Sequence, residues 1–413
     1  MRRFLLLAAV LALVAAGCGD DTAATTTVAT TTATTAAITT TSVSTTTAPT
    51  LPLAPVTEHP GLPSALSRSL IPMDQIDQGW VVVTYSAGQL EPFVEGPVVM
   101  YLVSPEGDRY EIAAFPVGGP QPMLGSLAND GTHVVAGMWT EPEVTVVTID
   151  LATGISQTVA AFEGYPRLGT TLPTGRDVVV ARTTFDPIAE HLEVYLTNGA
   201  LLAEIGVKTS DYPQYTWLYG LDGTFLVVGD GTTLEVIGND GTPLRPLDTP
   251  AAMCDPVRWW DATTILAACV PDSIAATSGY YHVLWLIPVD GSAPTRLTVD
   301  PAPDVSVVEF GHANAWRVGG QTLLQWYGDC GARAVQVLQP DGTAQFLDLG
   351  VPDGPWIYAQ AGDNLVIHTI AGCGDSFGAL SLIAPDGSLV RTLVPQVAGY
   401  QGVTAVAAMI PTP

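Results

Sequence analysis

The chain has 413 residues, of which 47% are hydrophobic and 13% are charged, and its formal net charge is −26. This length allows two or three ordinary domains or one large repeat architecture. Nucleic-acid binding needs clustered cations, so 40 acidic residues against 14 basic ones argue against such a partner. The excess charge serves solubility, or else it serves a cation or a cationic partner. Apolar residues occur in short β-branched runs, which predicts an all-β fold.

The N-terminus carries a targeting signal. Arg2 and Arg3 precede an apolar run, residues 4–16, that ends at Gly17-Cys18. The run is too short to cross a hydrocarbon core of roughly 30 Å. It resembles a bacterial lipoprotein signal peptide, in which cleavage falls before a lipidated cysteine and small residues stand just upstream. The resemblance implies that residues 1–17 are removed and that Cys18 carries the lipid anchor. An ordinary secretory signal with an incidental cysteine is the alternative.

A threonine-rich segment follows the cysteine. Between Gly19 and Thr50, 16 of 32 residues are threonine. Without a hydrophobic period this stretch cannot build a core, so we expect residues 18–62 to be a lipidated cysteine and a disordered tether. Residues 45–55 are also candidates for O-glycosylation. Together, the lipidated cysteine and the tether predict a protein that is anchored by lipid at the extracytoplasmic face of the cell membrane.

Residues 63–413 contain a repeat. Seven turn glycines recur at separations of 47, 45, 42, 50, 51 and 45 residues, and they are Gly107, Gly154, Gly199, Gly241, Gly291, Gly342 and Gly387. A period near 47 residues with four strands per unit is typical of propeller blades. In the second repeat the predicted strands are residues 123–129, 132–139, 144–151 and 155–162. The sequence therefore predicts a seven-bladed β-propeller with four-stranded blades.

The first repeat lacks one strand. Residues 80–85, 98–103 and 109–115 supply only three, whereas one apolar segment, residues 403–410, is left over at the far end of the chain. We interpret that segment as the innermost strand of the first blade. It would close the ring and leave no free edge to pair with a neighbour.

Turn-and-strand phrases such as residues 127–131, 149–154 and 289–298 resemble the TolB-like, WD-repeat-like propellers of bacterial envelopes. The resemblance covers roughly residues 75–410. Its motifs are specific for fold and weak for function. TolB itself has six blades and an additional α/β domain, so its role in an envelope complex is not implied for this chain.

Four cysteines remain in a compartment that favours oxidation, and they allow three pairings. Cys254 and Cys269 flank one hairpin symmetrically and should face each other across a strand pair. Cys330 and Cys373 occupy matching places in the sixth and seventh blades and could join them. A zinc site made of four thiolates is the rival interpretation, although no C-x-x-C pair is present.

The sequence predicts no cofactor and shows no established catalytic signature. Ser376 resembles a nucleophile only superficially, because no helix follows it. His191, Glu190 and Asp186 are interpreted as part of a long loop between the second and third strands of a blade. Metal or proton chemistry is conceivable there, and a solvated loop is the simpler interpretation.

Propellers usually bind ligands around the central channel, on the face that carries the loops between blades. The candidate ligand-binding residues on that face are Tyr165, Arg167, Asp211, Tyr212, Tyr215, Asp255, Asp329, Trp356, Asp375 and Tyr400. Rings mixed with carboxylates suit a saccharide, a peptide or a cationic ligand. The leading hypothesis is a monomeric binding or scaffold module for a protein, peptide or saccharide. The alternatives are a hydrolase or lyase acting on extracellular saccharide or peptide, and a sensor that passes ligand binding to a partner protein.

Overall fold

The computed structural model describes residues 59–163, 166–170, 175–185, 188–209, 215–251, 253–272, 281–299, 311–328, 333–350, 354–369 and 378–412. The predicted signal peptide, Cys18 and most of the predicted tether lie outside them. Residues 47–413 form one compact unit that contains all the named elements. Within the described ranges, no helix has the length and apolar character needed to cross a bilayer.

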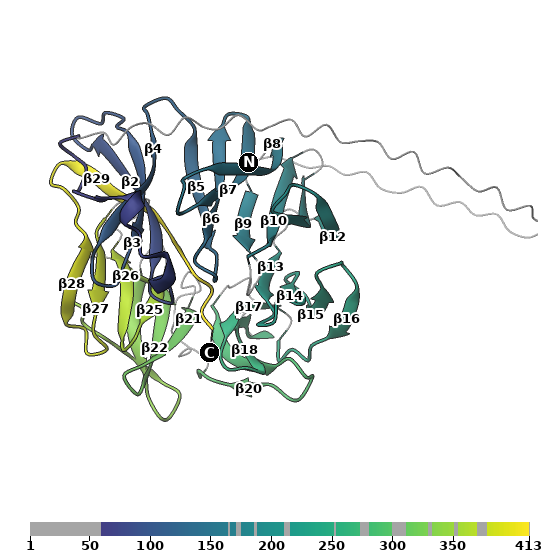
Figure 1. The fold of residues 1–413 in the computed structure, drawn as a ribbon. Helices are drawn as coiled ribbons and strands as arrows, with labels where there is room; N and C mark the ends of the chain where they lie inside the picture. The colour runs from purple at the N-terminus through teal and green to yellow at the C-terminus, as the bar shows by residue number, and fades with distance from the viewer. Residues whose placement is uncertain are drawn as a thin grey trace, which may run out of the picture. The chain divides into compact units, whose positions relative to one another are not determined.

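The unit is a seven-bladed β-propeller (Figure 1). The first blade contains β1 (Leu66–Ser67), β2 (Val81–Gln89), β3 (Val98–Val103), β4 (Arg109–Phe115) and β29 (Tyr400–Ala408). Two short 3-10 helices, η1 (Arg68–Leu70) and η2 (Met73–Gln75), connect β1 to β2. The second blade contains β5 (Gln121–Leu127), β6 (His133–Thr140), β7 (Glu143–Asp150) and β8 (Ser156–Glu163). The third contains β9 (Pro166–Thr170), β10 (Asp177–Phe185), β11 (Ile188–Leu196) and β12 (Leu201–Thr209).

The remaining four blades are built in the same order. The fourth contains β13 (Thr216–Tyr219), β14 (Phe225–Gly229), β15 (Leu234–Gly238) and β16 (Pro243–Pro246). The fifth contains β17 (Met253–Trp259), β18 (Thr264–Val270), β19 (Val283–Pro288) and β20 (Thr295–Arg296). The sixth contains β21 (Gly311–Val318), β22 (Gln321–Tyr327), β23 (Arg333–Leu338) and β24 (Ala344–Phe346), and the seventh contains β25 (Pro355–Ala361), β26 (Asn364–Thr369), β27 (Leu380–Ile383) and β28 (Leu389–Val394).

The last strand closes the ring, as predicted. β29 pairs antiparallel with β2, with Val83 opposite Val406 and Tyr85 opposite Val403. Figure 1 shows the yellow β29 beside the purple β2. The closing strand was predicted over residues 403–410 and is observed three residues earlier at its start. The sequence analysis missed β1, which adds a fifth strand parallel to β4.

The blades are stacked so that most inner strands are buried on both faces. In β2, Val82 belongs to a hydrophobic cluster shared with the second blade, whereas Val81 and Val83 belong to one shared with the seventh. All six residues of β3 are buried. Each buried valine stabilises the fold by about 1.5–3 kcal/mol relative to an exposed one. Continuous apolar runs, rather than alternating ones, are therefore what this architecture requires.

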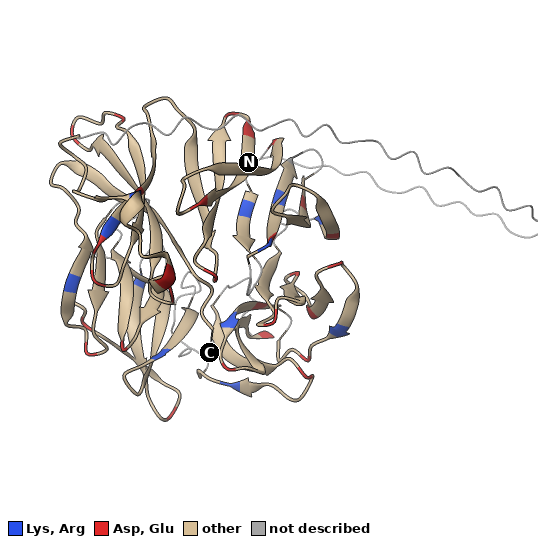
Figure 2. Ribbon diagram, in the orientation of Figure 1, with Lys and Arg blue, Asp and Glu red and all other residues tan. Residues whose placement is uncertain are grey.

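The two ends of the strands form two different faces. We call the end with the loops between blades and between second and third strands the loop face. The opposite end, with the hairpins between first and second and between third and fourth strands, is the turn face. All seven repeat glycines lie in turns on the turn face with positive φ, between 69° and 89°. Figure 2 shows many acidic residues in such turns and few basic residues in the described chain.

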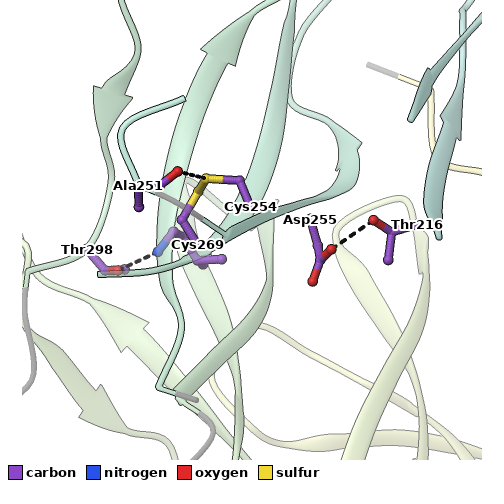
Figure 3. Close-up of a disulfide and its surroundings, with 7 residues drawn as sticks. Thr216, Ala251, Cys254, Asp255, Cys269 and Thr298 are labelled. Atoms are coloured by element: carbon purple, nitrogen blue, oxygen red, sulfur yellow. Dashed lines mark hydrogen bonds between the residues drawn. A yellow bond between two sulfur atoms is a disulfide. The ribbon is translucent and has the colours of Figure 1, made fainter. Parts of the chain in front are cut away.

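One of the two predicted disulfides lies in the described chain and is confirmed. Cys254 of β17 and Cys269 of β18 are register partners, and their sulfurs are bonded with a Cα–Cα distance of 4.1 Å (Figure 3). The bond joins the first two strands of the fifth blade. Cys330 and Cys373 lie outside the described residues, so their pairing stays a prediction.

Candidate functional site

Five of the ten predicted ligand-binding residues are described by the structure, and they fall on five different blades of the loop face. Tyr165, Asp211, Tyr212, Asp329 and Asp375 lie outside the described residues. The other five begin or immediately precede first strands: Arg167 in the third blade, Tyr215 in the fourth, Asp255 in the fifth, Trp356 in the seventh and Tyr400 in the first. Of these five, the structure brings together only Arg167 and Tyr215. A ligand role for any of them stays a prediction.

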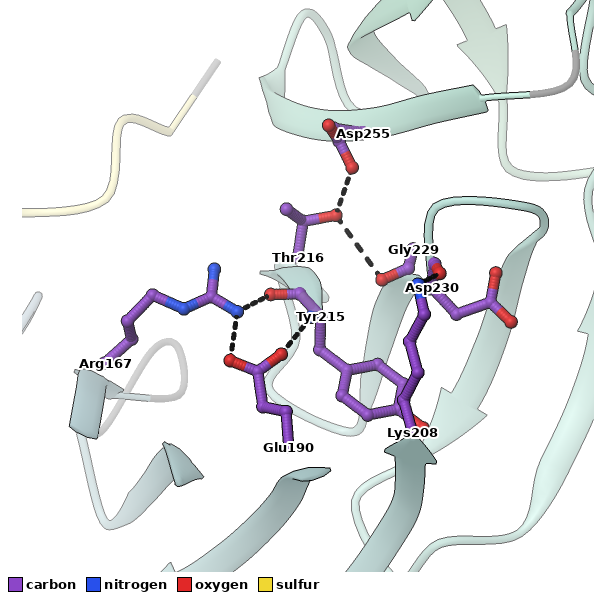
Figure 4. Close-up of polar contacts among 8 residues, drawn as sticks. All are labelled: Arg167, Glu190, Lys208, Tyr215, Thr216, Gly229, Asp230 and Asp255. Carbon is purple, nitrogen blue, oxygen red and sulfur yellow. Dashed lines mark hydrogen bonds and ion pairs between the residues drawn. The ribbon is translucent and has the colours of Figure 1, made fainter. Parts of the chain in front are cut away.

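Arg167 and Tyr215 meet around a buried carboxylate (Figure 4). Arg167 Nη2 donates to Glu190 Oε1 at 2.7 Å and to the backbone oxygen of Tyr215. The backbone nitrogen of Tyr215 donates to Glu190 Oε2. The Glu190 side chain is 2% exposed, whereas that of Arg167 is 42% exposed. These contacts hold the start of β13 against the third blade, so the polar atoms of Glu190 serve the fold.

The remaining predicted residues also have intramolecular partners. Asp255 Oδ1 accepts from the hydroxyl of Thr216 at 2.8 Å, which links the fourth and fifth blades. The ring centroid of Trp356 lies 4.8 Å from the Arg333 guanidinium. The Tyr400 ring meets the His59 ring edge to face, with the centroids 6.2 Å apart. These contacts give each residue a role in joining segments of the propeller.

The position predicted for His191 was wrong. His191 and Glu190 lie within β11 rather than in a loop, since β10 and β11 form a tight hairpin. Neighbouring positions in a strand point to opposite faces of the sheet, so the two side chains do not act together. His191 instead faces Glu193 and Glu204, whose ligand atoms lie within 4.8 Å of one another and of a histidine nitrogen.

This histidine-glutamate group has the residue types that a divalent metal uses. Glu193 is already occupied, because it accepts from Arg182 at 3.0 Å and from the hydroxyl of Tyr195 at 2.9 Å. A metal ion would have to compete with the Arg182 charge for the same carboxylate. The group is therefore explained by an ion pair on the face of the third blade that meets the second.

A cavity of about 330 Å³ opens on the turn face, at the inner ends of the fifth, sixth, seventh and first blades. Its walls come from residues that end or follow the first strands of these blades, together with Gln78 before β2. They include Gln78, Arg258, Trp260, Arg317, Gln360 and Pro411. The described lining offers N–H donors and aromatic surface but contains no carboxylate, histidine or cysteine. It therefore offers hydrogen-bond donors and apolar contact area to a ligand.

The chain's last described segment forms part of this cavity. Ile410 exchanges two hydrogen bonds with the side chain of Asn129 in the second blade, at 2.8 and 3.1 Å. Its side chain packs against the clusters of the third, fourth and fifth blades. The segment after β29 thus crosses the centre of the ring on the turn face. It positions Pro411 and Thr412 against the cavity.

Two arginines dominate the chemistry of the cavity. The Arg258 guanidinium lies 3.9 Å from the ring centroid of Trp316, and the Arg317 guanidinium lies 4.7 Å from that of Trp260. Arg258 also donates to the backbone oxygen of Ala315 at 3.3 Å, and Arg317 donates to the backbone oxygen of Trp260. Burial, and then the charge of Arg317, lower the pKa of Arg258 to about 10. Arg258 therefore remains cationic at neutral pH.

A second cavity of about 380 Å³ adjoins the first and shares Gln78 and Gly362 with it. It is lined by Asp77, Glu106 and Arg391, among others, so its charge is mixed. The sequence analysis missed both cavities. A signal was present, since Arg258-Trp259-Trp260 and Trp316-Arg317 occupy similar places in adjacent blades of a chain with few cations.

The propeller is similar to several solved structures. An acylaminoacyl peptidase in complex with a chloromethyl ketone aligns with a TM-score of 0.53 and 13% identity over 78% of this chain. The β-propeller domain of the Trilobed protease from Pyrococcus furiosus aligns with a TM-score of 0.52 and 12% identity, over 78% of this chain and 95% of that one. TolB from Acinetobacter baumannii aligns with a TM-score of 0.42 and 10% identity, over 79% of this chain and 67% of that one.

This chain spans about half of the peptidase, 51% of its length. At such identities the likeness shows the fold alone, and the fold is that of β-propellers. A scan against protein-family models and a search of curated proteins found no match.

Proposed function

We propose that the protein is a lipid-anchored binding module of the cell envelope and that its ligand enters the cavity on the turn face. The observation that carries the proposal is the lining of that cavity. It combines cationic and amide donors with aromatic surface, and its described residues include no carboxylate, histidine or cysteine. Such a mixture binds and orients a ligand without supplying a base or a strong nucleophile.

The position of the cavity supports this proposal. The described chain begins at His59, which contacts Tyr400 at the loop-face end of β29. The cavity lies at the other end of the same strand, beside Pro411. The first described residue therefore lies on the loop face, and the cavity opens at the opposite end of the propeller.

A hydrolase or lyase remains the second candidate. The first two similar structures are a peptidase and the propeller of a protease, according to their names. Incubation of the full mature chain with peptide and polysaccharide substrates separates the two functions. Turnover that persists in a variant with a blocked cavity would favour the enzyme, whereas saturable binding without product favours the binding module.

A cavity-filling variant tests the site. Gln360→Trp places a large ring in the cavity, and Glu143→Trp places the same ring on the exposed start of β7 as a control. On glycan and peptide arrays, we expect Gln360→Trp to lose the ligands that the parent chain binds and Glu143→Trp to keep them. The reverse pattern would assign the ligand to the loop face.

The anchor needs its own test. We expect metabolic labelling with a fatty-acid analogue to mark the parent chain and not Cys18→Ala. The variant should also keep residues 1–17, because cleavage depends on the lipidated cysteine. Equal labelling of the parent and of Cys18→Ala would exclude a lipid anchor at Cys18.

A further inference from the structure

We propose that the cavity is an oxyanion site in which Arg258 and Arg317 bind a carboxylate or phosphate group of the ligand. This inference rests on the binding function proposed for the cavity and names the chemical class of what it binds. It concerns two residues that the sequence analysis did not single out.

Contacts between the fifth and sixth blades preorganise both guanidinium groups. Arg258 of β17 stacks on Trp316 of β21, and Arg317 of β21 stacks on Trp260 beside β17. Each guanidinium also donates one hydrogen bond to a backbone oxygen of the other blade. Both planes are thereby fixed before any ligand arrives. A guanidinium has five N–H donors, so most of them are left for a planar or tetrahedral oxyanion.

The two cationic side chains of the cavity lack a paired carboxylate among the described residues. On the third blade, Arg167 and Arg182 are each paired with a buried glutamate. Within the described residues, neither Arg258 nor Arg317 forms an ion pair, although the chain carries 40 acidic residues. Two cations in one cavity repel each other, and the lowered pKa of Arg258 reflects both this repulsion and its burial. An anion bound between them would relieve the repulsion.

Apart from the two arginines, the described residues that line the cavity are neutral. Gln78 and Gln360 contribute amide groups to the same walls, and each uses one N–H in a bond to a backbone oxygen. Their other polar atoms can contact hydroxyl or amide groups of a ligand. A volume of about 330 Å³ is at the lower end of the range for small-molecule sites. The site therefore fits a small organic anion or the acidic end of a longer molecule.

The competing explanation is purely structural. The reciprocal stacking could simply join the fifth and sixth blades, in which case anions would not bind and the arginines would contribute only to stability. The two explanations differ in one measurable respect, because only an oxyanion site responds to anion concentration in a saturable way at constant ionic strength.

The test uses the full mature chain and three probes, which are inorganic phosphate, citrate and glucuronate. Each is titrated by calorimetry and by thermal unfolding, with sodium chloride added to hold the ionic strength constant. We expect saturable binding of at least one probe. Arg317→Gln and Arg258→Gln should each weaken it about tenfold or more, because a charge-assisted hydrogen bond is lost. A carboxylate-only or phosphate-only response identifies the source of the oxyanion.

Arg245→Gln is the matched control, because Arg245 is an exposed residue of β16 outside the cavity. It should bind the probes as the parent does. Arg317→Lys keeps the positive charge but loses the planar, bidentate guanidinium donors, so it should bind the probes more tightly than Arg317→Gln and more weakly than the parent. If Arg258→Gln does not fold, the exposed Arg317 variants carry the test alone. Equal binding by the parent, Arg317→Gln and Arg245→Gln would overturn the inference.

Failure of this inference is distinct from failure of the proposed function. If no probe binds, but neutral glycans or peptides bind the parent and are lost in Gln360→Trp, the cavity binds a ligand without being an oxyanion site. If neither anions nor neutral ligands bind, both proposals are wrong.

Discussion

Arg258 and Arg317 hold each other's blades: each guanidinium lies against a tryptophan of the other's blade and donates to a backbone oxygen there. The pair therefore has a structural contribution in addition to the proposed ligand role. Both contributions come from the same geometry, because a cation fixed on an aromatic ring is both a contact between blades and a preset donor.

The stability of this pair can be measured separately from ligand binding. Arg317 is exposed, so we expect Arg317→Ala to lower the free energy of unfolding by about 0.5–1 kcal/mol, the value of an exposed cation–π contact. Urea unfolding without added anion measures this change. A loss above about 3 kcal/mol would mean that the arginine is mainly a structural joint between the fifth and sixth blades.

The Arg167–Glu190 pair should matter more for stability. Removing Arg167 leaves the Glu190 carboxylate, 2% exposed, without its cation. We expect Arg167→Met to cost about 3 kcal/mol, near the lower end for breaking a buried pair because Arg167 itself is partly exposed. The double variant Arg167→Met/Glu190→Gln should lose less than the sum of the single changes. Additive losses in chemical denaturation would contradict the buried pair.

The disulfide of the fifth blade closes a short loop. Cys254 and Cys269 are 15 residues apart, and cross-linking a loop of that size stabilises a chain by about 3 kcal/mol in the chain-entropy model. We expect the double variant Cys254→Ala/Cys269→Ala to have a free energy of unfolding lower by about 3 kcal/mol, and therefore to unfold at a lower urea concentration. Reduction of the parent should have an effect at least as large, because it would also break the predicted Cys330–Cys373 bond. An unchanged midpoint in both cases would show that the bond does not form in solution.

Stability should fall on mild acidification. His368 is 1% exposed, and burial, followed in effect by the nearby Arg333 charge, lowers its pKa to about 4. Between pH 6.5 and 4 the unfolded histidine binds a proton that the folded one does not, so the folded state loses up to about 3 kcal/mol as pH falls through this window. The loss is complete below pH 4.

Burial also lowers the pKa of His133 and His312, so these two residues likewise destabilise the folded state as pH falls. The raised pKa of Glu111 has the opposite effect on stability. The variant His368→Gln isolates the effect of one ring. We expect its free energy of unfolding to depend less steeply on pH than that of the parent between pH 6.5 and 4.5. Identical slopes would show that His368 titrates normally.

Ring closure predicts the effect of truncation. A chain ending at Gly399 loses β29, which exposes the edge of β2 and removes Val403 from its buried place. An unpaired inner edge favours association with other chains. We expect the truncated protein to aggregate, as judged by size-exclusion chromatography. A soluble monomer with normal thermal stability would contradict the closed ring.

Much of the fold was predictable because it is a repeat of local signals. The turn glycines mark hairpins, and the four strands of the second blade begin and end within two residues of their predicted bounds. Cys254 and Cys269 were predictable because they lie symmetrically about one hairpin. His191 was misplaced because Asp186-Pro187 was interpreted as part of a longer loop that also included Glu190 and His191. β1 was missed because a two-residue strand has no period.

By itself, the sequence determined the number of blades, the closing strand and one disulfide, since these depend on spacing along the chain and on which residues repeat. Only the tertiary structure decided where polar groups meet. Arg258 and Arg317 are 59 positions apart in the sequence and line one cavity. The segment after β29 lines the same cavity only because the ring closes. Among the described loop-face residues, Asp255 and Trp356 have partners from neighbouring blades, because stacking brings together side chains that no local pattern links.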